Sequence, residues 1–211
     1  LPKDARVIEA RDWSVLPGLV DAHTHAVFAG DRRSELHRRL SGETYASIAA
    51  DGGGIVSTVA ATSLATEEEL TVQSRTRLDA MLACGTTTCE IKSGYGLDLD
   101  AELKMLRVIR RLGESHPIDV VSTFMGAHEI PSEHRSNRVR YVELVVDEMI
   151  PAVAAAGLAD FCDVFCEEGV FTGAESQRIL EAGQRAGLGA RIHADELGAS
   201  GGSLVAAAIG A

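Results

Sequence analysis

Short apolar runs alternate with longer helical segments along most of this 211-residue chain. Five such runs begin near residues 18, 86, 119, 161 and 190, and a stretch of helical length follows each of the first four. Strands that alternate with helices in this way indicate βαβ units, whose strands lie parallel in one sheet. The alternation therefore predicts an α/β fold built on a parallel sheet.

Capping signals and glycines predict where the helices begin and end. Thr66-x-x-Glu69 and Thr172-x-x-Glu175 have the capping-box pattern, which satisfies the first free N–H groups of a helix. We expect a helix from Thr66 to Gly85, helices over about 99–112 and 139–156, and one from Thr172 to about Gly187. Residues 35–50 are helix-prone, and residues 1–16 alternate loosely, as short strands do. The glycines at 52–54 lack a following Gly-Lys-Ser, which argues against a phosphate-binding loop.

Polar residues gather where each predicted strand ends. They are His23 and His25, residues 92–96, His128, residues 166–169 and residues 193–196. In a (β/α) TIM-like barrel the active site lies at this end, because the βα loops meet there. A doubly wound sheet also alternates, but it concentrates its chemistry at one switch point. The pattern favours a barrel represented by about its first five βα units, with three more strands expected downstream.

The first strand carries a pair of histidines. A Pro-Gly turn precedes Leu19 and Val20, which we interpret as the start of a buried strand. Side chains alternate along a strand, so His23 and His25 share a face about 7 Å apart and can converge on one metal ion. Asp21 shares that face and could anchor a ring nitrogen. The alternative is two surface histidines in a turn.

His193 is the natural third metal ligand, because it ends the fifth strand at the same edge. Glu196 follows three residues later, where a turn could direct its carboxylate toward the metal. Three histidines with an open position are typical of a catalytic rather than a structural metal site. The alternative is a structural histidine, which is the commoner role of a single one.

Charge and cysteine content narrow the class of partner. The chain has 20 basic and 31 acidic residues, a net charge of −11, which argues against nucleic acid or anionic membranes as partners. An anionic substrate would then need particular arginines. No apolar run is long enough to span a bilayer, and no signal peptide precedes the first strand. The four cysteines show no CxxC spacing, and reduced thiols in a cytoplasmic protein are expected.

The motifs at the strand ends resemble those of a known family. Pro-Gly-Leu-Val-Asp-Ala-His-Thr-His is similar to the first-strand signature of the metal-dependent amidohydrolase superfamily. Further runs resemble the imidazolonepropionase family within it: His-x-Val-Phe-x-Gly-Asp-Arg, Gly-Gly-Gly-Ile-x-Ser-Thr-Val, Glu-Ile-Lys-Ser-Gly-Tyr-Gly-Leu, Lys-Met-Leu-Arg-Val, Gly-Ala-His and His-Ala-Asp-Glu. The resemblance extends from about Trp13 to the last residue, and the run around Tyr95 is its most specific part.

The resemblance implies hydrolysis of the cyclic amide of 4-imidazolone-5-propanoate to N-formimidoyl-L-glutamate by a metal-activated water, in cytoplasmic histidine degradation. It implies zinc or iron on His23, His25 and His193. It places four residues around the substrate and two in catalysis: Arg32, Tyr45, Tyr95 and His128 for the substrate, Glu196 and His128 for the chemistry. It also implies that residues 1–16 end a small β domain and that residues 17–211 are a partial barrel.

The chemistry of the individual residues agrees with these roles. The substrate's propionate needs a cation, and Arg32 offers a planar fork, although a solvated arginine is the alternative. Tyr95 lies between two glycines, which predict an exposed loop; Tyr45 could instead pack under a helix. His128 could donate a hydrogen bond to a ring carbonyl or be structural. Lys92 ends the second strand rather than the fourth, so we expect a single metal ion and no carboxylated lysine bridge.

Two other functions stay open. One is deamination of a nitrogen heterocycle on the same scaffold, against which Arg32 and Tyr95 argue. The other is a non-catalytic half-barrel that binds a partner or forms a homodimer through exposed strand edges. The family has a further histidine and a metal-binding aspartate beyond the fifth strand, which these 211 residues lack. We therefore expect the 211-residue piece alone to be inactive.

Overall fold

An open parallel half-barrel forms the centre of the computed structural model, which describes residues 2, 4–44, 47–48 and 51–211. Five strands follow the order β1-β2-β3-β4-β5, a short β6 also pairs with β4, and every pairing is parallel. The strands are β1 Leu19–Thr24, β2 Thr86–Lys92, β3 Asp119–Ala127, β4 Phe161–Cys166, β5 Gly189–Ala190 and β6 His193–Ala194. The predicted alternation of strands and helices in an α/β fold is confirmed.

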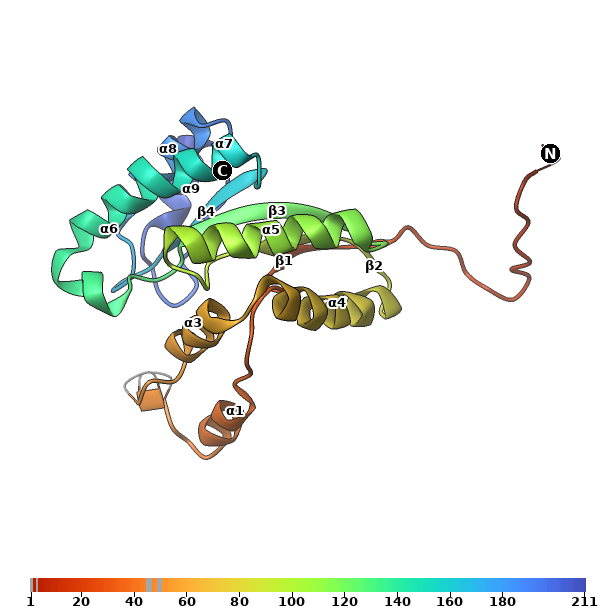
Figure 1. The fold of residues 1–211 in the computed structure, drawn as a ribbon, viewed down its shortest axis with the longest axis horizontal. Coiled ribbons are helices and arrows are strands. Elements are labelled where there is room, and N and C mark those ends of the chain that lie inside the picture. Colours follow the sequence, from red (N-terminus) through yellow and green to blue (C-terminus); the bar gives the residue numbers. More distant parts are fainter. Residues whose placement is uncertain (1, 3, 45–46, 49–50) are drawn as a thin grey trace.

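Some of the helices pack against the sheet, whereas those that follow β1 directly lie away from it (Figure 1). The helices are α1 Arg33–Leu40, α3 Ile55–Leu64, α4 Glu67–Ala83, α5 Leu99–Ser115, α6 Arg138–Leu144, α7 Ile150–Ala156, α8 Gly173–Arg185 and α9 Gly202–Ile209. Helix α5 packs on β3 and α4, and α8 packs on β4 and α9. The core between these layers contains Leu70, Leu78, Met105, Ile109, Phe124 and Ile179, all fully buried.

The capping signals place two helices correctly. Both capping boxes form: the Thr66 and Thr172 hydroxyls accept the N–H groups of Glu69 and Glu175, and each glutamate returns a bond to its threonine N–H. Gly113 does not end its helix, because α5 continues to Ser115. Residues 55–64 form α3, a helix that was not predicted from the sequence.

The helix predicted over 139–156 is one continuous element with a wider turn inside it. A 3-10 helix, Ser132–Asn137, leads into α6, and a π-helical turn, Val145–Met149, joins α6 to α7. The N–H of Ile150 bonds to the carbonyl of Val145, five residues back. Pro151 has no N–H with which to continue the ordinary pattern, so the widened turn accommodates it.

Three strand predictions need correction. Leu19 and Val20 are 59% and 69% exposed, because β1 is paired only with β2 in the described chain. The described residues before Leu19 form no strand and extend away from the sheet (Figure 1), since no neighbouring strand pairs with them there. The fifth strand is interrupted between β5 and β6, where Arg191 turns its guanidinium over the Phe161 ring at 4.1 Å.

The cysteines are free thiols. Cys89, Cys162 and Cys166 are buried, Cys84 is exposed, and all four are free, as expected. Within the described ranges, no helix combines the length and apolar character needed to cross a bilayer.

A buried tyrosine joins the helices to the loop after β2. The Tyr141 hydroxyl lies 2.8 Å from the carbonyl oxygen of Gly126 and 3.0 Å from that of Leu97. Burial raises the pKa of this phenol well above its ordinary value, so it stays protonated and able to donate. With a single proton, it donates to one carbonyl at a time.

We predict that Tyr141→Phe lowers the free energy of unfolding by about 1–3 kcal/mol, because two buried carbonyls lose their donor. Urea unfolding followed by circular dichroism measures the change. Ser115→Ala, which removes an exposed hydroxyl at the end of α5, is the control and should change stability by less than about 0.5 kcal/mol. Equal stabilities of the Tyr141→Phe variant and the unsubstituted protein would contradict this role of the hydroxyl.

Candidate functional site

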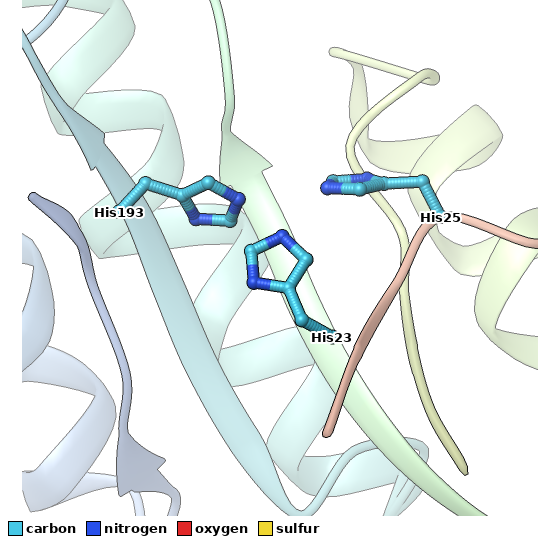
Figure 2. A group of neighbouring side chains, drawn as sticks. All are labelled: His23, His25 and His193. Atoms are coloured by element: carbon cyan, nitrogen blue, oxygen red, sulfur yellow. The ribbon is translucent and has the colours of Figure 1, made fainter. Parts of the chain in front are cut away.

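Three histidines converge at the carboxyl edge of the sheet. His23 comes from β1, His25 directly follows that strand, and His193 begins β6. One ring nitrogen from each lies within 4.8 Å of the other two, and Figure 2 shows the three rings pointing toward one another. The predicted convergence of His193 with the histidine pair is therefore confirmed, although β1 ends at Thr24, before His25.

The donor set fits a metal ion. Nδ1 of His25 is buried and has no hydrogen-bond partner among the described residues, so a ligand at this point would satisfy it. Burial, and then the nearby His128 and His193, lower the pKa of His25 to about 2. Burial and His193 also lower the pKa of His23. Neutral imidazoles are the form that binds metals.

Asp163 positions the third histidine. Its Oδ1 lies 3.0 Å from Nδ1 of His193, and the aspartate is buried in β4. The role predicted for Asp21 is wrong in detail: its carboxylate accepts the backbone N–H of His23 at 3.3 Å rather than a ring N–H.

A network of buried charges continues from Asp163 into the sheet. The Lys92 ammonium lies 2.7 Å from Asp163 Oδ2 and 2.7 Å from Glu90 Oε2. Arg191 Nε lies 3.0 Å from Glu90 Oε1. Lys92 is therefore engaged by two carboxylates.

His128 stacks on the His25 ring, with ring centres 4.9 Å apart and planes inclined by 17°. Its Nδ1 lies 2.8 Å from the carbonyl oxygen of Gly94, which can only accept, so this nitrogen carries the proton. Burial lowers the pKa of His128 to about 4, and the neutral ring then presents Nε2 as an acceptor. The expected donation from His128 to a substrate carbonyl is therefore not available to this neutral form.

Tyr95 lies beside the same rings, 5.5 Å from the centre of His25 and 5.2 Å from that of His128. The prediction of an exposed loop around it is wrong. The buried Glu102 carboxylate accepts the N–H groups of Gly94, Gly96 and Leu97 at 2.8–3.1 Å and draws the loop onto the start of α5. Burial raises the pKa of Glu102, while these backbone bonds oppose the shift.

Comparison with known proteins identifies relatives of the chain. It is 55% identical over 209 residues to the imidazolonepropionase of Alkaliphilus metalliredigens, covering 99% of this chain and 50% of that protein. It is 58% identical to that of Shouchella clausii, over 98% of this chain and 46% of the relative, and 53% identical to that of Haloarcula marismortui, over 97% and 48%. By sequence, the chain is a relative of the imidazolonepropionases. It spans about half the length of these curated relatives.

The fold is also found in a solved structure. An adenine deaminase from Arthrobacter aurescens matches with a TM-score of 0.58 and 15% identity, over 92% of this chain and 62% of that chain. At this identity the likeness supports the α/β half-barrel alone. No protein-family model matches the chain.

Three further residues suggested by the imidazolonepropionase resemblance do not contact the histidine cluster directly in the described chain or lie outside it. Arg32 is exposed where α1 begins, and its charge is among the causes that lower the pKa of His128, after burial and His193. Glu196 is exposed; its backbone N–H bonds to Glu167 Oε1 at 2.8 Å, and no contact of its carboxylate with the histidines is found in the described chain. Tyr45 lies outside the described residues.

The buried charges beside the histidine cluster were not predicted from the sequence. Glu90 and Lys92 are two residues apart in β2, so they share a face, and this spacing could have indicated a paired site. Asp163 is a single carboxylate in the apolar run Phe-Cys-Asp-Val-Phe-Cys, which signals a buried charge that requires a partner. Arg191 carried no comparable signal.

We predict that Gly94→Ala destabilises the protein and displaces His128. Gly94 has φ +102°, and an added Cβ would lie 2.9 Å from His128 Nδ1 and 2.9 Å from the Met125 carbonyl oxygen. The matched control is Gly187→Ala, at φ +89° with nothing within 4 Å, which isolates the backbone strain of about 1–2 kcal/mol.

Thermal unfolding and the NMR signals of the His128 ring measure the two effects. Gly94→Ala should lower stability more than Gly187→Ala does, and only Gly94→Ala should shift the His128 signals. Equal losses of stability with unmoved His128 signals would contradict the tight packing of this loop.

Proposed function

We propose that the protein containing this chain hydrolyses the cyclic amide of 4-imidazolone-5-propanoate to N-formimidoyl-L-glutamate. The observation that carries the proposal is the meeting of His23, His25 and His193 at the carboxyl edge of a parallel half-barrel. The orphaned Nδ1 of His25 supports a ligand at this point. The relatives named imidazolonepropionase, 52–58% identical over nearly the whole chain, support the choice of reaction.

His23, His25 and His193 would hold one zinc or iron ion. Such an ion supplies Lewis acidity and lowers the pKa of a water ligand to about 7. The lowered pKa values of His23 and His25 keep their rings neutral for this role. The Lys92 ammonium is already paired with the carboxylates of Glu90 and Asp163, which favours one metal ion over two metal ions bridged by a carboxylated lysine.

The substrate would lie over His128 and Tyr95, beside His25. Arg32, at the start of α1, would bind the propionate through its guanidinium fork. The unprotonated Nε2 of His128 suits a ring N–H of the imidazolone as its donor. Tyr45 would complete the substrate contacts.

Glu196 would move the protons. Water oxygen bonds to the ring carbonyl carbon, the adjacent ring C–N bond breaks, and the released nitrogen gains a proton. A carboxylate within reach can take the proton from water and return it to that nitrogen. Because Glu196 is exposed on the turn after β6, this role requires the turn to bring its carboxylate toward the histidines.

We also propose the partners, the location and the domain division of the protein. We infer a small anionic substrate, held by Arg32 against the overall negative charge, and a cytoplasmic location like that expected of histidine-degrading relatives. The net charge of −11 argues against nucleic-acid or membrane partners. For the 211-residue piece taken alone, we propose a homodimer in which two copies associate through the open edge of β1, whose Leu19 and Val20 are exposed. We also propose that residues 1–16 belong to a small β domain and that residues 17–211 belong to the barrel.

We predict that metal binding and proton transfer separate by mutation in the intact protein. Glu196→Gln keeps the shape of the side chain but removes the base, so it should retain metal and lose about 10²- to 10⁴-fold in turnover. His193→Ala should lose metal as well as activity. Ring opening is followed by the loss of the substrate's ultraviolet absorbance, and bound metal by elemental analysis. An intact protein with bound metal and no ring opening would overturn the proposed reaction and favour the non-catalytic alternative.

A second prediction concerns Arg32. Arg32→Ala should weaken substrate binding by about tenfold to a hundredfold, since a charge-assisted contact contributes about 1.5–3 kcal/mol. Arg32→Lys should restore only part of this, because lysine lacks the fork geometry. Arg33→Ala is the control, because Arg33 pairs with Asp31 at 2.7 Å on the exposed surface. The Michaelis constants of the three variants test the assignment, and an unchanged value for Arg32→Ala would refute it.

A further inference from the structure

The carboxylate that contacts His193 belongs to a closed set of buried charges. Glu90, Lys92 and Asp163 have side chains only 2%, 2% and 1% exposed, and Arg191 adds a second cation at Glu90. The set holds two carboxylates and two cations. The charges of these four side chains therefore balance one another.

The donors and acceptors in this set have only one arrangement. An ammonium group has three N–H donors and no acceptor, so Lys92 must donate to an oxygen of Asp163. Lys92 donates to Oδ2 of Asp163 at 2.7 Å, which leaves the other oxygen, Oδ1, facing Nδ1 of His193 at 3.0 Å. An ionised carboxylate only accepts, so Nδ1 of His193 carries the proton and Nε2 is left with its lone pair.

We propose that Lys92, acting through Asp163, fixes the tautomer of His193, and that both are positioning residues for the metal centre. The inference rests on the proposed role of His193 as a metal ligand. Lys92 pins the aspartate, the aspartate holds the Nδ1–H of His193, and the lone pair of Nε2 is thereby presented to the site shared with His23 and His25. A purely structural ion pair would stabilise the sheet but would not dictate which ring nitrogen is protonated.

The substitution Asp163→Asn separates these two roles. The asparagine amide has an accepting oxygen and a donating NH₂ group, and the Lys92 ammonium can hydrogen-bond only to the oxygen. The NH₂ group then faces Nδ1 of His193, which must become an acceptor, and the proton moves to Nε2, where it blocks the metal. Lys92→Met in this background frees the amide to turn its oxygen back to His193. The second substitution should therefore rescue the first.

Two measurements on the intact protein test this inference. The first is the ¹⁵N–¹H correlation pattern of the His193 ring without metal: we expect the Nδ1–H tautomer in the unsubstituted protein and the Nε2–H tautomer in Asp163→Asn. The second is the affinity for Zn²⁺ in competition with a chelator. Asp163→Asn should lose at least about 10- to 100-fold, as expected for the loss of a partner that orients a metal ligand. Asp163→Asn/Lys92→Met should regain most of that loss.

The control is Arg138→Met, which breaks an ion pair with Glu175 of the same 2.7 Å length, between α6 and α8 and outside the histidine cluster. It should lower stability and leave zinc affinity unchanged. A double variant that binds zinc no better than Asp163→Asn would overturn the inference, as would an Nδ1–H tautomer in Asp163→Asn. If a Lys92→Met protein does not fold, the tautomer of Asp163→Asn alone decides. Absence of zinc binding in the unsubstituted protein would refute the metal centre. The tautomer of His193, which is read without metal, would still show whether Lys92 and Asp163 control which ring nitrogen carries the proton.

Discussion

The ammonium of Lys92, held between the carboxylates of Glu90 and Asp163, is the interaction on which the arrangement of the site depends. It joins β2 to β4 across β3, inside the sheet, and from Asp163 it extends to His193. Buried charges are expensive to desolvate, and the removal of one partner from such a pair typically costs about 3–5 kcal/mol. The geometry of the third histidine is thus tied to the stability of the sheet.

Another buried carboxylate, that of Glu102, holds the loop that follows β2. Glu102 gathers the N–H groups of Gly94, Gly96 and Leu97, and Leu97 adopts φ 60°, a strained value for a residue with a side chain. The loop held in this way presents the Gly94 carbonyl to His128 and places Tyr95 beside His25. The sheet and the loop therefore fix the three clustered histidines and the rings of His128 and Tyr95 by separate networks.

The sequence predicts much of this arrangement, because periodicity and capping are local signals. The helices beginning at Thr66 and Thr172 and the histidines at strand ends follow from such signals. The partners of Lys92 do not, since they depend on which strands become neighbours and on the side chains that face inward. The exposure of Leu19 and the π turn before Pro151 likewise depend on tertiary pairing and on one missing N–H, which apolar spacing does not report.

The most direct test of the account is the position of a bound ion. Crystals of the intact protein grown with zinc, with anomalous diffraction collected at the zinc absorption edge, would locate it. The account predicts one peak at the cluster, with His23, His25 and His193 each contributing a nitrogen at about 2.0–2.1 Å and Asp163 still bonded to the other nitrogen of His193. A peak coordinated without His193, or no peak among the three histidines, would contradict it.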